Sequence, residues 1–129
     1  MSRRYLDDIG VTERHDTWNK EDLRQEQWSM ERSIYGFDER ETWALEHAFY
    51  CWLYERLKMY VDVCNVRLDY HKFEYEGEML TQQECINRMI KGCETYFKYD
   101  SLWAVPEEDQ KAINDIAKIW AIVLPAMWW

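Results

Sequence analysis

The clearest hydrophobic pattern in the chain begins after Asp38. Residues 39–61 contain no Gly or Pro, and large apolar side chains recur there at intervals of four residues: Leu45, Phe49, Leu53 and Leu57. This spacing is typical of one face of an α-helix. Neighbouring aromatic residues widen the apolar arc, which indicates burial against more than one neighbour. The pattern predicts a central helix.

A shorter helix is predicted before it, opening at Lys20 with Asn19 as the N-cap residue. Acidic side chains at 21 and 22 suit the first turn of a helix, and Gly36 is a typical residue just beyond a helix end. The apolar positions of this segment are few and unevenly spaced: Leu23, Trp28, Met30 and Ile34. The prediction of a helix over 19–35 therefore depends mainly on its end signals.

The pattern changes after the central helix. Apolar and polar residues alternate between Val66 and Tyr75, and a turn signal follows at Glu76 and Gly77. Alternation with period two on one side of such a turn is typical of a strand, so we predict a β-hairpin near residues 66–79.

Two further helices are predicted from their first residues. Thr81 and Glu84 have the spacing of a capping box and open a helix that runs to Phe97. Pro106 suits the first position of a last helix, because the acidic residues at 107–109 that follow it favour the positive end of the helix dipole.

These patterns together predict a mainly α fold, a single-domain bundle of about four helices with a small β-hairpin near residues 66–79. Residues 1–18 are polar and aperiodic, and we interpret them as an N-terminal arm, or a short helix followed by a loop, preceding a helical domain at 19–129. A chain of 129 residues is long enough for one domain. Its four Gly and two Pro are too few for a turn-rich β-sandwich.

The formal net charge of −9 restricts the classes of partner. A nucleic-acid groove needs clustered Lys and Arg, and docking on an anionic membrane needs them too, so neither partner is expected. An acidic chain fits two other situations. The charge either keeps a solvated exterior or attracts a basic partner.

The cysteines and the chain ends favour the cytoplasm. None of the four cysteines forms a C-x-x-C pair, and such residues commonly behave as small buried hydrophobes. The first residues turn acidic where a signal peptide would be apolar. The longest apolar stretch, 119–129, is about half of a membrane span and is interrupted by Pro125.

The sequence carries no recognisable catalytic motif. The chain has no G-x-S-x-G elbow and no Gly-rich phosphate loop. His47 and Cys51 lie four residues apart beside Glu46 and could begin a metal site, but no second ligand pair has zinc-like spacing. The helical carboxylates lack the E-x-x-E spacing of all-α nucleotide pyrophosphatases. We therefore expect no metal, no cofactor and no catalytic residue.

The excess of aromatic residues is the least ordinary feature, with eight Trp and nine Tyr. Such side chains are frequent in interface hot spots, although core packing is the competing explanation. In polar or terminal contexts the interface is favoured, with acidic neighbours that would speed encounter with a basic partner. The predicted partner-binding residues are Trp18, Glu26, Trp28, Glu31, Trp128 and Trp129.

Residues 36–46, GFDERETWALE, carry a motif of the form G-F-x-x-R-x-T-W-x-L-[DE]. With Arg56-Leu57-Lys58 and Met89-Ile90 further on, the chain resembles a family of small proteins of bacteriophages and prophages that has no established activity. It departs from that family at Glu46, where Asp is usual, and at its last residues, Met127-Trp128-Trp129. The resemblance implies a viral accessory protein in the cytoplasm of a bacterial host.

The R-x-T-W part of the motif has two interpretations. In the structural one, which we favour, Thr42 caps the central helix, Trp43 packs into the core, and Arg40 pairs with an acid such as Glu46. In the other, Arg40, Trp43, Glu46 and His47 surround one ligand pocket.

Two functions from different classes follow. The favoured one is a non-enzymatic protein that binds a host protein, for example to inhibit a component of bacterial defence, with a version in which the acidic surface mimics nucleic acid. The alternative is a small-ligand module, either a nucleotide sponge or a metal-dependent nucleotide hydrolase. Self-association is left open by the sequence.

Overall fold

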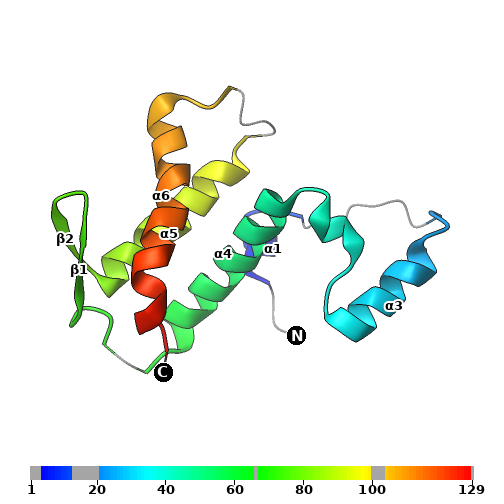
Figure 1. The fold of residues 1–129 in the computed structure, drawn as a ribbon, viewed down its shortest axis with the longest axis horizontal. Helices are drawn as coiled ribbons and strands as arrows, with labels where there is room; N and C mark the ends of the chain where they lie inside the picture. The colour runs from blue at the N-terminus through cyan, green and yellow to red at the C-terminus, as the bar shows by residue number, and fades with distance from the viewer. Residues whose placement is uncertain (1–3, 13–20, 66, 100–103, 129) are drawn as a thin grey trace. The chain divides into compact units, whose positions relative to one another are not determined.

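The computed structural model describes residues 4–12, 21–65, 67–99 and 104–128 (Figure 1). Helices dominate these residues, and a single two-stranded sheet accompanies them there, which confirms the predicted mainly α fold with a small hairpin. The chain forms two compact units, residues 1–55 and residues 56–129. We describe them separately as unit 1 and unit 2.

Unit 1 contains α1 (Tyr5–Asp8), α3 (Gln25–Tyr35) and the first part of α4 (Leu45–Val63). The predicted first residues of α3, 19 and 20, lie outside the described residues. Asp22 accepts a hydrogen bond from the backbone N–H of Arg24 at 2.8 Å and forms a turn, so the helix begins at Gln25 rather than Lys20. Gly36 ends α3 as predicted, with φ at 85° in the left-handed region.

A 3-10 turn, η1 (Glu39–Thr42), precedes α4. The predicted central helix is continuous from residue 39. In the structure, α-helical geometry begins only at Leu45. The Asp38 carboxylate accepts a hydrogen bond from the backbone N–H of Arg40 and so caps η1. The prediction that Thr42 caps α4 is wrong. Thr42 lies within η1, and its Oγ1 donates to the carbonyl oxygen of Glu39 at 2.6 Å.

Unit 2 contains the hairpin of β1 (Lys72–Tyr75) and β2 (Glu78–Thr81). The strands are antiparallel, with Phe73 opposite Leu80. Both residues of the predicted turn have positive φ, 50° at Glu76 and 81° at Gly77, as a type I′ turn requires. The hairpin begins several residues later than predicted, because residues 67–71 form a bend and not a strand.

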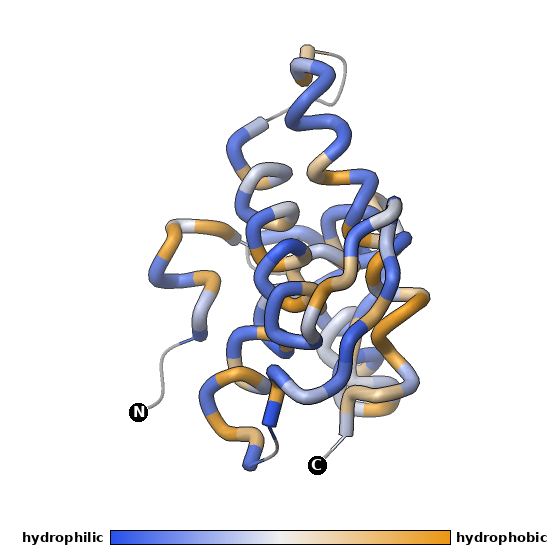
Figure 2. The backbone as a smooth tube through the Cα atoms, turned by 90° about the vertical axis from the view of Figure 1, so that its left-hand side faces the viewer, coloured by the Kyte–Doolittle hydropathy of each residue, from blue (hydrophilic) through white to orange (hydrophobic). Residues whose placement is uncertain are grey.

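The other helices of unit 2 are α5 (Gln82–Phe97), α6 (Glu107–Val123) and the 3-10 turn η3 (Leu124–Ala126). Pro106 is the residue before α6 rather than its first residue. Hydrophilic and hydrophobic stretches alternate along the helical turns of the chain (Figure 2), and the buried residues of α5 and α6 recur at helical spacing. The two helices meet at Gly92, where an added Cβ would lie 2.5 Å from Cγ1 of Ile116 and 2.7 Å from the carbonyl oxygen of Ala112. Glycine is what lets α5 and α6 approach so closely.

Buried apolar residues occur in both units. They include Leu6, Trp28, Cys51, Leu53, Tyr54, Leu57, Cys85, Ile86, Met89, Cys93, Ile113, Ile116, Ile119 and Val123. Three of the four cysteines are thus buried small side chains, as predicted, and Cys64 is half-buried. Within the described ranges, none of the helices combines the length and the apolar character needed to cross a membrane.

The predicted capping box at the start of α5 is confirmed. The backbone N–H of Glu84 donates to Thr81 Oγ1 at 3.1 Å, and the N–H of Thr81 donates to the Glu84 carboxylate at 3.0 Å. Thr81→Ala is expected to lower the free energy of unfolding by about 1 kcal/mol, because it leaves a helical N–H without its partner. Urea denaturation followed by circular dichroism measures this loss. Thr81→Ser keeps the hydroxyl and should retain most of the stability; an equal loss in both variants would contradict the assignment.

Candidate functional site

Trp28 belongs to the interior of unit 1 and not to an exposed face. Its side chain is 0% exposed, and Nε1 donates to the Glu39 carboxylate at 2.9 Å. The guanidinium carbons of Arg40 and Arg24 lie 4.4 Å and 4.9 Å from the centre of its ring. The prediction that Trp28 is an exposed partner-binding residue is wrong, because the side chain is fully buried and held by cation–π contacts and a hydrogen bond within unit 1.

The arginine of the R-x-T-W motif pairs with a neighbouring acid. Both oxygens of Asp38 accept from the Arg40 guanidinium, at 3.0 Å and 2.7 Å, and both side chains are buried. Burial alone would raise the pKa of Asp38, but the hydrogen bonds and charge of Arg40 outweigh it and hold that pKa below its usual value. Arg40 therefore pairs with an acid, as predicted, but the acid is Asp38 and not the suggested Glu46. This bidentate pair fixes the chain between α3 and α4.

Trp43 does not pack into the core as predicted. Its side chain is 42% exposed, and its ring meets the ring of Trp28 edge-on at 5.9 Å. The 3-10 geometry of η1 explains the difference, because it delays the α-helix and leaves Trp43 before the first turn of α4. Trp43 covers the buried Trp28 from the solvent side.

Glu46 and His47, the other two residues of the predicted ligand pocket, lie on the first turn of α4. Glu46 is exposed, and His47 is half-buried. His47 Nε2 lies 3.0 Å from the carbonyl oxygen of Thr12 and 3.5 Å from Cys51 Sγ. The four predicted pocket residues thus have different surroundings, with Arg40 held in the interior and Glu46 at the surface. Among the residues that the structure describes, no three His, Cys, Asp or Glu side chains gather as metal ligands.

The predicted acidic partner-binding residues differ from each other. Glu26 is exposed on α3, one helical turn before Met30. Glu31 is half-buried, and its carboxylate accepts hydrogen bonds from the N–H of Glu39 at 3.1 Å and from Gln27 Nε2 at 3.3 Å. Glu31 therefore caps the start of η1 and is an unsuitable residue for contact with a partner, whereas Glu26 remains suitable.

Of the three remaining tryptophans in the predicted set, Trp18 and Trp129 lie outside the described residues. Trp128 follows η3 in unit 2 and is largely exposed, as the prediction requires. Its backbone carbonyl oxygen lies 3.5 Å from the hydroxyl of Tyr60 on α4.

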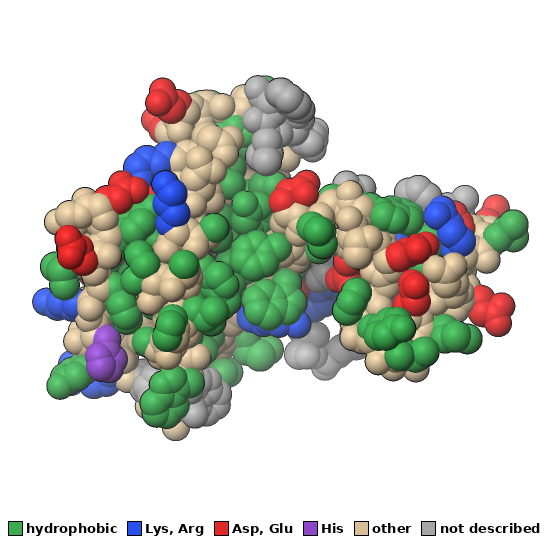
Figure 3. All heavy atoms as spheres, in the orientation of Figure 1, with side chains coloured by type: hydrophobic (Ala, Val, Ile, Leu, Met, Phe, Trp, Pro, Cys, Tyr) green, Lys and Arg blue, Asp and Glu red, His purple; other side chains and the backbone are tan. Residues whose placement is uncertain are grey.

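Four large hydrophobic side chains on and just after α3 lie at the surface of unit 1. Met30 is 59% exposed and Ile34 is exposed one turn further along α3. The exposed rings of Tyr35 and Phe37 follow, with their centres 6.2 Å apart. We call Met30, Ile34, Tyr35 and Phe37 the α3 apolar surface. Hydrophobic side chains with acidic ones among them are visible over α3 in Figure 3.

The spacing of these residues along α3 explains why they are exposed. This spacing is the sequence signal that could have predicted the exposed surface. Trp28 and Met30 are two positions apart, which places them on nearly opposite sides of α3. Once Trp28 occupies the interior, Met30 must face outward, and Ile34 lies beside it at i+4. Leu23, in the turn before α3, is also exposed.

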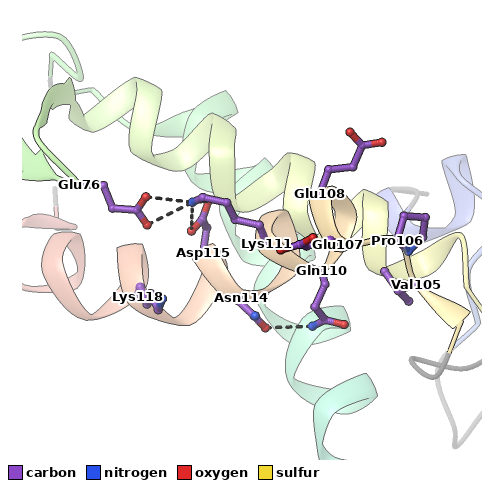
Figure 4. Close-up of a pocket in the computed structure, with 10 residues that line it drawn as sticks. All are labelled: Glu76, Val105, Pro106, Glu107, Glu108, Gln110, Lys111, Asn114, Asp115 and Lys118. Atoms are coloured by element: carbon purple, nitrogen blue, oxygen red, sulfur yellow. Dashed lines mark hydrogen bonds and ion pairs between the residues drawn. The ribbon is translucent and has the colours of Figure 1, made fainter.

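A groove of about 940 Å³ runs along α6 in unit 2 (Figure 4). The ammonium group of Lys111 lies 3.1 Å from both the Glu76 and the Asp115 carboxylates, and Tyr75 donates its hydroxyl proton to Asp115. Burial and these carboxylates raise the pKa of Tyr75, while the Lys111 hydrogen bond lowers the pKa of Glu76. These groups satisfy one another and form an ion-pair network along the groove wall, which accounts for the shifted pKa values.

No protein-family model, curated protein or solved structure matches this chain. The resemblance of residues 36–46 to phage proteins therefore stays a prediction. The candidate site is defined by its own geometry, the α3 apolar surface and the charges around it.

Proposed function

We propose that this chain is a non-enzymatic binding protein that uses the α3 apolar surface to bind a basic protein. Its resemblance to phage accessory proteins makes a protein of the bacterial host, such as a component of a defence system, the partner that we propose. The observation that carries the proposal is a set of large apolar side chains exposed on one helix of an acidic unit.

Exposure of the α3 apolar surface costs free energy in the isolated protein. Each large apolar side chain that leaves water contributes roughly 1.5–3 kcal/mol, so covering Met30 and Ile34 together would supply much of the affinity of a specific complex. Adjacent exposed apolar and aromatic side chains with polar neighbours are typical of protein-binding sites. Nothing about the surface requires catalysis, which agrees with a binding role.

The charge of unit 1 favours a basic partner. Its described residues include eleven carboxylates and four arginines. All four arginines are in ion pairs: Arg4 with Glu55, Arg24 with Asp22, and Arg32 and Arg40 with Asp38. The net charge that remains is negative, and Glu26 places some of it beside Met30. A basic partner is attracted by this field, whereas a second copy of the acidic unit is repelled.

Affinity capture with the full chain tests the proposal. Met30→Ser with Ile34→Ser should lower the recovery of a bacterial host protein about tenfold or more, because the loss of two buried anchors exceeds 1.4 kcal/mol. The matched control is Met79→Ser with Ile122→Ser in unit 2, since Met79 is also 59% exposed. The control variant should recover the partner as the unmodified chain does.

Charge is tested separately at Glu26, because Glu31 has a structural role. Glu26→Gln should reduce the association rate and weaken its dependence on salt, without a change in the circular dichroism spectrum. Equal recovery by the α3 variant and the control variant would refute the proposed surface. A salt dependence unchanged by Glu26→Gln would refute the electrostatic part alone.

A further inference from the structure

A small cavity in unit 2 has the composition of a ligand site. Its volume is about 250 Å³, and three segments meet around it. Residues 67–71 are held against the start of α5, because the backbone N–H groups of Gln82 and Gln83 donate to the carbonyl oxygens of His71 and Leu68 at 3.2 Å and 2.8 Å. The cavity is lined by Arg67, Tyr70, His71, Gln82, Ala126 and Trp128.

The carboxamide of Gln82 is the buried polar group of the cavity. The side chain is 2% exposed, and its Nε2 lies 3.4 Å from both the Tyr60 hydroxyl and the carbonyl oxygen of Ala126. These distances are beyond the usual range for N–H···O hydrogen bonds, so both bonds are weak. Within the described ranges, the carboxamide oxygen accepts no hydrogen bond from another residue. A buried amide with such weak partners gains from a ligand that offers a donor and an acceptor side by side.

The rim of the cavity is aromatic. Tyr70 and Trp128 are 71% and 74% exposed, which is unusual for two large rings at the edge of one small cavity. Aromatic side chains in this position bind planar ring systems through their faces. The volume of about 250 Å³ lies just below the roughly 300–1,000 Å³ of pockets for drug-sized ligands, which suits a smaller ligand such as one planar ring system.

The charges at the rim favour a neutral ligand over an anionic one. Arg67 is the cationic residue that lines the cavity, and its Nε and Nη2 each donate to the Asp69 carboxylate at 3.1 Å. This bidentate pair offsets the charge of the guanidinium and uses two of its N–H donors, which weakens its attraction for a phosphate. The net charge of −9 of the whole chain also repels an anionic ligand.

We propose that this cavity binds a neutral planar heterocycle, a free nucleobase or the base of a nucleoside. The Gln82 carboxamide pairs with the donor and acceptor on one edge of the base, and Tyr70 and Trp128 contact its faces. The sugar of a nucleoside extends into solvent. The cavity lies in unit 2, so the proposal is independent of the α3 apolar surface and of the partner proposed for it.

Isothermal titration of the full chain with free bases, nucleosides and the corresponding 5′-monophosphates tests this proposal. At least one base should bind at millimolar concentration or below, with its nucleoside binding similarly and its monophosphate no tighter. Trp128→Ala should weaken binding about tenfold or more through the loss of a stacking surface. Trp52→Ala, which removes an exposed tryptophan of unit 1, should leave the affinity unchanged.

Gln82→Met tests the hydrogen bonds, because it keeps the length of the side chain and removes the carboxamide. Affinity should fall about tenfold or more, as a site that loses its paired donor and acceptor requires. If this variant does not fold, Trp128→Ala decides the question, since an exposed ring is not needed for folding. Saturable binding of none of the bases, an affinity unaffected by Trp128→Ala, or tighter binding of a monophosphate than of its nucleoside would each overturn the proposal.

Discussion

Replacement of Trp28 by alanine is expected to lower the free energy of unfolding by about 3–5 kcal/mol, the usual cost of removing a large buried aromatic side chain. The loss has three parts. The substitution removes the ring contacts with Trp43, Arg24 and Arg40. It also removes the hydrogen bond from Nε1–H to Glu39, and it leaves the partly buried Glu39 carboxylate without this donor. Urea denaturation followed by circular dichroism measures the difference.

Two further variants separate these parts. Trp28→Phe keeps an aromatic ring for the two guanidinium groups but removes the donor to Glu39 and part of the buried indole, so it should cost about 1–3 kcal/mol, less than Trp28→Ala. Trp43→Ala should cost less than Trp28→Ala, because 42% of the Trp43 side chain is already exposed. A larger loss for Trp43 than for Trp28 would contradict the placement of the two rings.

The second large effect is expected at Gly92. Gly92→Ala should lower the free energy of unfolding by about 1–3 kcal/mol through overpacking between α5 and α6. Alanine is favoured over glycine in a helix by about 1 kcal/mol, so a substitution without a steric conflict would instead stabilise the protein. The sign of the change therefore tests the close approach of the two helices.

A double-mutant cycle with Ile116→Ala identifies the cause of that loss. Ile116 supplies two of the three atoms nearest to the added Cβ, at 2.5 Å and 2.9 Å. Gly92→Ala should cost less when Ile116 is already alanine, with a coupling energy of about 0.5–3 kcal/mol. Lys91→Ala, at an exposed position of the same helix, serves as the control and should leave stability nearly unchanged. Additive effects at positions 92 and 116 would show that the two residues do not meet.

Local signals predicted the elements whose ends depend on neighbouring residues. Thr81 and Glu84 predicted the start of α5, Gly36 the end of α3, and Glu76 with Gly77 the hairpin turn. In each case the deciding interaction lies within four residues of the chain, in a capping hydrogen bond or a left-handed backbone conformation. The sequence contains all that such interactions need.

The candidate surface could be predicted only in part. Glu26 and Trp128 are exposed, as the sequence suggested from their polar and terminal contexts. Trp28 and Glu31 were misassigned, because each forms a hydrogen bond with Glu39, which lies eight to eleven positions further along the chain. Trp43 was misassigned for the opposite reason, since a large aromatic residue in an apolar pattern indicated a core position.

By itself, the sequence determined the class of fold, the order of the helices and hairpin, and the acidic character of the chain, because these depend on local propensity, periodicity and composition. The tertiary structure alone decided which side of α3 is buried. Trp28 rather than Met30 turns inward on α3, since Glu39 and Arg40, which follow the helix, give the indole a hydrogen-bond acceptor and a second cation beside that of Arg24. The exposed Met30 and Ile34 follow from that choice through the geometry of the helix.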